Sequence, residues 1–225
     1  LTALDLIGVF VFALSGGVLA AEKRLDPFGV VFLAFIAAAS GGIARDVLIG
    51  ATPPYALTTW TYAAVAAAAG MVCYFGASAI QRISTPVAVF DAIGLGLFAV
   101  VGARKALDYG LSPLMASMMG MITAIGGGMT RDILTAQTPM VLQRDIYALA
   151  ALGGAGVLSF GVAAGFPPDI VAPLGALLTI TIRLVALSRR WSLPTATVKP
   201  TSRGAKPTIR PKRRPADDET DASGG

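Results

Sequence analysis

The chain has 225 residues, of which 55% are hydrophobic and only 14% are charged, and its mean hydropathy is +0.70. A soluble domain carries about 25% charged residues, and a soluble domain of this length needs a polar surface around its core. Residues 4–187 hold too little charge to form one. The composition therefore excludes a soluble globular protein and predicts that most of the chain lies in lipid.

The net charge of +5 belongs to one end of the chain. Residues 1–182 hold eight Lys/Arg and nine Asp/Glu, a net of −1, whereas residues 183–225 hold ten basic and four acidic residues, a net of +6. A basic flank beside apolar segments is typical of a membrane-surface segment rather than of nucleic-acid binding. With no histidine and with Cys73 as the only cysteine, histidine relays, metal clusters, disulfides and Ser-His triads are excluded. We therefore expect no enzyme activity, no metal site and no cofactor.

Seven stretches are apolar and long enough to span a bilayer, which takes about 20 residues. Proline stands at or just before the start of three of them, where its missing N–H costs nothing. The pattern predicts an all-α membrane protein with seven transmembrane helices. The predicted spans are residues 4–21, 28–49, 59–80, 87–103, 113–134, 146–164 and 170–187.

The basic residues between these spans indicate how the chain is oriented. Lys/Arg follow the first, third, fifth and seventh spans, whereas of the alternate connections only the one after the fourth span is basic. The positive-inside rule then predicts a multi-pass membrane protein with its N-terminus outside and its C-terminus in the cytoplasm. The segment 191–225 is rich in proline and charge, so we expect it to be a disordered tail.

An internal repeat is the most informative feature of the sequence. A shift of 86 residues, without a gap, makes 18 of the 49 positions from Asp5 to Pro53 identical. Each copy contains three spans, and because three is odd, the second copy enters the membrane in the opposite sense. The sequence predicts two inverted three-helix repeats, at 1–86 and 87–166, followed by a seventh helix at 167–190 and the tail. Inverted repeats of this kind are common in transporters.

A glycine cluster occupies the equivalent place in the second and fifth spans. Each glycine inside a helix costs about 1 kcal/mol relative to alanine, and a broken helix in a membrane is tolerated where it lines water or is buried in protein. We expect both helices to be interrupted there and to line a polar path, with hydroxyl groups beside the glycines. Close helix packing is the alternative. The predicted pore-lining residues are Ser40, Gly41, Gly42, Thr123, Gly126, Gly127, Gly128 and Thr130.

Charged residues recur within the same spans. Adjacent residues on a helix point about 100° apart, so each arginine is expected to pair with an acid on another helix rather than with its neighbour. Structural ion pairing without a role in conduction and arginines that snorkel to the interface are the alternatives. The charge-pair candidates are Asp5, Arg45, Asp46, Asp91, Arg131 and Asp132.

Arg104 and Lys105 lie at the end of the fourth span, on the side that the positive-inside rule should deplete of basic residues. Tyr109 follows one turn later. We interpret these three residues as candidates for a gate at a pore mouth, with interfacial anchoring as the alternative.

The paired signatures Gly41-Gly42-x-x-Arg45-Asp46 and Gly127-Gly128-x-x-Arg131-Asp132, within an inverted repeat plus a seventh helix, resemble the prokaryotic trimeric intracellular cation (TRIC) channel family. The resemblance covers about residues 4–187. It implies a homotrimer in membrane lipid, with a pore in each subunit lined by kinked second and fifth helices and permeable to potassium or other monovalent cations. Ser40 departs from a full glycine triplet. Some prokaryotic relatives are labelled glycine transporters, so a carrier of a small solute such as glycine is the alternative.

Overall fold

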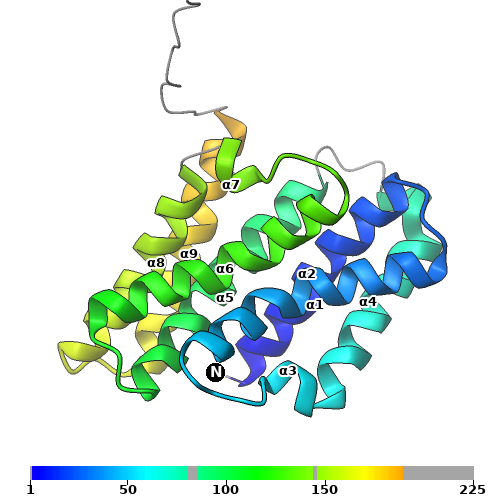
Figure 1. Cartoon of the computed structure of the whole chain (residues 1–225). Coiled ribbons are helices and arrows are strands. Elements are labelled where there is room, and N and C mark those ends of the chain that lie inside the picture. The colour runs from blue at the N-terminus through cyan, green and yellow to red at the C-terminus, as the bar shows by residue number, and fades with distance from the viewer. Residues whose placement is uncertain (1, 81–85, 144–145, 190–225) are drawn as a thin grey trace, which may run out of the picture. The chain divides into compact units, whose positions relative to one another are not determined.

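The computed structural model of the protein describes residues 2–80, 86–143 and 146–189. Within those residues every regular element is a helix (Figure 1). Seven helices are long, and α3 and α7 are single turns. The elements are α1 (Thr2–Glu22), α2 (Pro27–Leu48), α3 (Tyr55–Thr58), α4 (Trp60–Ile80), α5 (Pro86–Asp108), α6 (Pro113–Leu134), α7 (Met140–Gln143), α8 (Ile146–Ala163) and α9 (Pro168–Ser188).

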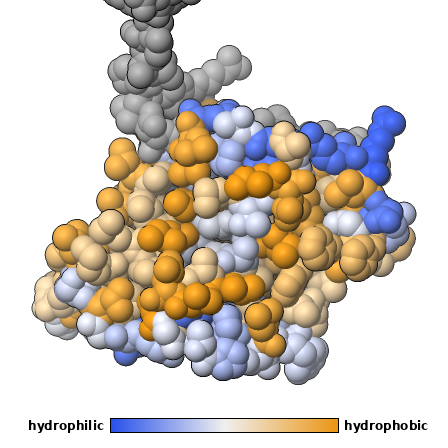
Figure 2. Space-filling view, viewed as in Figure 1, coloured by the Kyte–Doolittle hydropathy of each residue, from blue (hydrophilic) through white to orange (hydrophobic). Residues whose placement is uncertain are grey.

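The seven long helices confirm the predicted seven-span membrane protein. Among the described residues, α1, α2, α5, α8 and α9 are long and apolar enough on these grounds alone to cross a membrane. In α4 the apolar segment Trp60–Gly76 is shorter, and α6 carries glycine, hydroxyl and charged residues that lower its hydropathy. Large apolar side chains such as Phe28, Trp60 and Phe75 are more than 70% exposed, as lipid-facing residues would be. Hydrophobic residues also cover much of the face in Figure 2, with hydrophilic ones toward its upper and lower edges.

The 86-residue repeat reappears in the geometry. Pro27–Leu48 shifted by 86 is Pro113–Leu134, so α2 and α6 coincide end to end. Their N-caps, Asp26 and Ser112, are also equivalent and each accepts a hydrogen bond from the backbone N–H three residues on. Even the left-handed backbone positions recur, with φ of 57° at Arg24 and 83° at Gly110.

The two repeats form two three-helix bundles. Helix α1 packs against α2 and α4, helix α5 packs against α6 and α8, and the bundles meet through α1–α5 and α2–α6. Contacts across this junction are reciprocal: a Cβ atom on Gly8 would press on Phe98, and one on Gly94 would press on Phe12. The two phenylalanine rings stack with centroids 5.2 Å apart. Such reciprocity is the property of a two-fold axis, and the inverted repeat is therefore confirmed.

The glycine clusters are not breaks in the helices. Both α2 and α6 run without interruption through them, which corrects the expected interruption. A Cβ atom on Gly41 would overlap the carbonyl oxygen of Thr123, and one on Gly127 would overlap that of Ala37, its repeat equivalent. These glycines let the two backbones cross in contact while each helix keeps its own hydrogen bonds. The structure therefore shows close helix packing, the alternative to interrupted helices.

Helix α9 has no counterpart in the repeat. It packs against α8 and α5, and at its crossing with α8 the backbones of Gly154 and Gly175 leave no room for a side chain. It therefore covers the second bundle and leaves the first without an equivalent cover. The exact repeat boundaries at 86 and 166 stay predictions, and the predicted tail at 191–225 lies outside the described residues.

Candidate functional site: two charged clusters related by the repeat

The Arg-Asp pairs of the two signatures adopt the same geometry. Arg45 donates from Nε to Oδ1 of Asp46 at 2.8 Å, and Arg131 donates from Nε to Oδ1 of Asp132 at 2.9 Å. The expectation that sequence neighbours do not pair was wrong. An arginine side chain is long enough for its guanidinium to fold back onto the next residue, and in a buried setting each charge takes a partner within reach. All four residues are at most 5% exposed.

Asp46 and Asp132 also bind the backbone of the segments that follow α2 and α6. Oδ2 of Asp46 accepts the backbone N–H of Tyr55 at 2.9 Å, and Oδ2 of Asp132 accepts that of Met140 at 3.0 Å. These N–H groups lie at the first residues of α3 and α7, where a helix has donors without an internal partner. The signature aspartates therefore fix the loops that lead into α4 and α8.

Around the second signature lies a sealed cluster, which comprises Ser15, Asp91, Arg131, Asp132, Tyr147 and Arg183. Arg131 Nη1 donates to Oδ1 of Asp91 at 2.9 Å and also hydrogen-bonds the Ser15 hydroxyl. The Arg183 guanidinium lies over the Tyr147 ring, 4.6 Å from its centroid. Arg131 and Asp91 have no exposed surface. The predicted pairing of an arginine with an acid on another helix is therefore observed here.

Around the first signature lies an open cluster, which comprises Asp5, Arg45, Asp46, Tyr62 and Lys105. Asp5 is the equivalent of Asp91, but it hydrogen-bonds the Tyr62 hydroxyl instead of an arginine. Lys105 Nζ reaches Oδ1 of Asp46 at 2.8 Å, the same oxygen that Arg45 contacts through Nε and Nη2. Among the ion pairs of the described residues, none includes Asp5.

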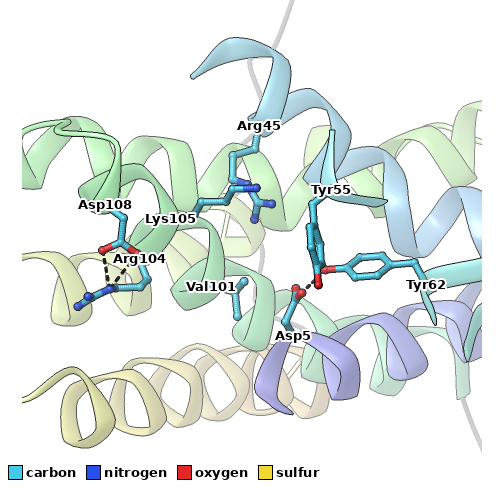
Figure 3. Close-up of a pocket in the computed structure, with 8 residues that line it drawn as sticks. All are labelled: Asp5, Arg45, Tyr55, Tyr62, Val101, Arg104, Lys105 and Asp108. Atoms are coloured by element: carbon cyan, nitrogen blue, oxygen red, sulfur yellow. Dashed lines mark hydrogen bonds and ion pairs between the residues drawn. The ribbon is translucent and has the colours of Figure 1, made fainter. Parts of the chain in front are cut away.

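A cavity of about 180 Å³ lies at the open cluster, lined by Asp5, Arg45, Tyr55, Tyr62, Val101, Arg104, Lys105 and Asp108. Figure 3 shows Arg45 and Lys105 together on one wall, and Asp5 with the two tyrosines on another. Arg104 and Asp108 pair with each other at 3.0 Å and point away from Asp5 of α1. Basic and acidic walls therefore face one cavity.

The differences between the clusters follow from positions where the repeat breaks. Ser15 is replaced by Val101 in the second copy, and Lys105 corresponds to Leu19 in the first. Tyr62 corresponds to Ala148. Helix α9 adds Arg183 to one cluster only. One end of the molecule is therefore filled by side chains, and the equivalent end keeps a cavity.

The last glycine of each cluster faces one of these two sites. A Cβ atom on Gly128 would press on the Tyr147 hydroxyl and on Asp91, at 2.8 and 2.9 Å. At the equivalent Gly42 the nearest group is the Arg45 guanidinium, at 3.8 Å. Gly42 thus borders open space where Gly128 borders packed side chains.

The predicted hydroxyl residues are mostly bonded to backbone. Thr123 donates to the carbonyl of Met119 at 2.7 Å, and Thr130 donates to that of Gly126 at 2.9 Å, both within α6. Ser40 donates across the helix crossing to the same Gly126 carbonyl at 3.4 Å. Thr123 is buried against α5 at Gly102, whereas Ser40 and Thr130 are partly exposed.

The structure places the gate candidates in two settings. Helix α5 extends to Asp108, so Arg104 and Lys105 are helical residues of the cavity wall rather than of a connection. Tyr109 is 51% exposed and does not line the cavity. Sequence reasoning missed Tyr62, Tyr147 and Arg183, because no motif distinguishes them. The signals of this site in the sequence were the repeated charges Asp5 and Arg45 and the basic pair Arg104 and Lys105, which stands against the positive-inside rule.

Comparison with known proteins gives consistent matches. The family model described as Glycine transporter matches residues 2–78 and 88–163, one segment for each repeat. A UPF0126 membrane protein of Deinococcus radiodurans is 40% identical, over 84% of this chain and 87% of its own. The UPF0126 inner membrane protein YadS of Escherichia coli is 36% identical, over 85% and 94%.

Solved structures show the same similarity in three dimensions. The TRIC trimeric intracellular cation channel orthologue from Rhodobacter sphaeroides is 33% identical, with a TM-score of 0.81 over 84% of this chain and 98% of that one. A second structure, which is described as the structural basis for conductance through TRIC cation channels, is also 33% identical. Its TM-score is 0.80, and the match covers 89% of this chain and 99% of that one.

Proposed function

We propose, from the premise that this chain belongs to the TRIC channel family, that it is a potassium-permeable cation channel of a prokaryotic inner membrane. The observation that carries the proposal is the match, along nearly the whole membrane-spanning part, to structures described as TRIC cation channels. We further propose a homotrimer with one pore in each subunit, lined by α2 and α6.

The geometry supports a path between the two repeats. The open and sealed clusters lie at opposite ends of the α2–α6 crossing, and Gly42 and Gly128 face them from the two halves. Ser40, Thr130 and the Gly126 carbonyl lie between the clusters. Hydroxyl and carbonyl oxygens suit a partly dehydrated monovalent cation better than fixed charges do. We read this structure as closed, because the glycine backbones touch at the crossing and Arg131 is fully buried.

The test is single-channel recording from purified protein in a planar bilayer under a potassium gradient. We expect discrete openings far faster than a carrier cycle, with a reversal potential near that of potassium. Light scattering of the same sample in detergent should give the mass of three chains. A preparation that moves glycine stoichiometrically without discrete openings would reject the channel. It would favour the alternative, a carrier of a small solute such as glycine, which the family model's description as Glycine transporter supports.

We propose that Lys105, Arg104 and Tyr109 influence gating at the mouth beside the cavity. A basic side chain there repels the cations that must pass unless it is paired, and Lys105 is paired with Asp46. Moving one charge through the whole membrane field is worth about 2.3 kcal/mol per 100 mV. A residue at the mouth crosses only part of that field, so voltage dependence should be shallow.

We also propose that the C-terminus is cytoplasmic, from the distribution of basic residues. Cys73 is buried, so a cysteine introduced at Ser223 would report on the tail. A membrane-impermeant maleimide should label it only after the inner membrane is permeabilised. Labelling of sealed, right-side-out spheroplasts would reverse the orientation.

A further inference from the structure

The two charged clusters reach the same charge balance by different routes. The repeat supplies each cluster with two aspartates and one arginine, a net of −1. A further cation brings each sum to zero: Lys105, which pairs with Asp46 in the open cluster, and Arg183 in the sealed cluster. Lys105 corresponds to Leu19, and Arg183 lies on α9, outside the repeat. Neither cation is therefore explained by the duplication.

Both of these cations lie over a tyrosine ring. Lys105 Nζ is 5.9 Å from the centroid of the Tyr55 ring, and the Arg183 guanidinium is 4.6 Å from that of the Tyr147 ring. Neither tyrosine has a tyrosine at its equivalent position in the other repeat. An aromatic face attracts a cation through the charge distribution of its π-system. The same pairing of a cation with a ring therefore occurs in both clusters, built from residues that are not repeat equivalents.

The packing of α9 on α8 places Arg183. The two helices run antiparallel, and a Cβ atom on Gly175 would overlap a backbone carbonyl of α8. One turn further, Thr179 donates a hydrogen bond to the carbonyl of Ala150 at 3.0 Å. The next turn of α9 brings Arg183 over Tyr147, three residues before Ala150. The position of the guanidinium thus follows from the helix crossing.

Tyr147 connects Arg183 to the helix that we propose lines the pore. A Cβ atom on Gly128 of α6 would stand 2.8 Å from the Tyr147 hydroxyl and 2.9 Å from Asp91. Arg183 and Asp91 both act on this tyrosine electrostatically. None of the three side chains is more than 1% exposed. The guanidinium, the ring and the carboxylate therefore form one packed group beside α6.

We propose that Arg183 closes the pore at the sealed cluster, as Lys105 is proposed to do at the open one. This inference rests on the proposed channel and assigns the unrepeated α9 a role in its gating. While Arg183 is present, the charges of the cluster sum to zero and its side chains fill the mouth. When the guanidinium leaves, a net negative charge remains, and that charge attracts cations into the path.

Single-channel recording in inside-out patches from giant spheroplasts tests the proposal, because the protein then has one orientation. Arg183→Met should raise the open probability several-fold and make the potassium current rectify. One unit charge at about 8 Å from the path changes the local cation concentration roughly twofold in water. Potassium entering from the sealed-cluster end should therefore carry about twice the opposite current at about 10 mM KCl, and screening should abolish the difference at about 1 M.

Three further variants separate a gating role from a structural one. Arg183→Lys keeps the charge and should restore the rectification and the open probability of the unmodified protein. Lys105→Met removes the cation of the other cluster, so its current should rectify in the opposite sense to that of Arg183→Met. The matched control is Arg189→Met, at an exposed arginine that follows α9, and it should change neither property.

A folded Arg183→Met protein that conducts exactly as the unmodified protein does would overturn the proposal and leave Arg183 a packing residue. If that variant does not fold, as judged by size-exclusion chromatography, Asp91→Asn decides. It is nearly isosteric and leaves one carboxylate against two cations, so the current entering from the sealed-cluster end should fall, and an unchanged current would overturn the proposal. Absence of openings in the unmodified protein would instead reject the channel, and this inference with it.

Discussion

Substituting alanine at Gly41 or Gly127 tests whether the α2–α6 crossing depends on glycine. The added Cβ atom would overlap a backbone carbonyl of the other helix in each case, and carbonyls cannot move aside as a side-chain end can. Restoring van der Waals contact requires the helices to separate by on the order of 1 Å. Overpacking of this kind costs about 1–3 kcal/mol, so each variant should lose that much unfolding free energy.

Gly42→Ala is the matched control one residue away. Its Cβ would meet only the end of the Arg45 side chain, at 3.8 Å, and alanine favours a helix by about 1 kcal/mol over glycine. This variant should be neutral or more stable. The double variant of Gly41 and Gly127 should cost less than the sum of the single variants, because both open the same crossing and the second methyl group uses the space made by the first.

The assay is unfolding by SDS titration in mixed micelles, followed by circular dichroism, with single-channel recording on each variant that folds. Gly41→Ala with the same unfolding free energy as Gly42→Ala would refute the assignment of the cluster to close packing. Strict additivity in the double variant would show that the two positions do not share one crossing.

Four further predictions use the same methods. Arg131→Met should lose about 3–5 kcal/mol of unfolding free energy, because two carboxylates are left buried without their cation. Arg104→Met breaks an exposed ion pair and should lose less than about 1 kcal/mol. Equal losses in the two variants would contradict the contrast in burial. Ala136→Gly should gain up to about 1 kcal/mol in the SDS titration, because φ is 54° there and only glycine adopts that region without strain; a loss would argue against that backbone. Lys105→Ala should raise open probability or shift its shallow voltage response in bilayer recordings while the protein stays trimeric, and unchanged gating would return this lysine to an interfacial anchor. Truncation after Leu193 should leave single-channel conductance unchanged, and a folded truncated protein without current would assign the tail a role.

The sequence alone determined the architecture. Lipid imposes long apolar helices, and the duplicated half of the chain leaves identical residues at a constant offset of 86 positions. The shift of 86 residues aligns α2 with α6 and implies the inverted repeat without reference to any contact. It also placed Asp5, Asp91 and the two Arg-Asp pairs at equivalent positions, and the ion pair of Arg131 with Asp91 in the structure joins two of these charge-pair candidates.

Only the tertiary structure decided what each equivalent residue does. Propensity marks Gly41 and Gly127 as unusual, but a glycine that breaks a helix and a glycine that admits another helix look alike in sequence, and the position of the neighbouring backbone distinguishes them. The same holds for the charges. Asp5 and Asp91 match under the repeat, yet the one borders a cavity and the other is sealed, because Lys105, Tyr62 and the unrepeated α9 reach only one cluster each. Those partners are distant in sequence, and packing alone brings them together.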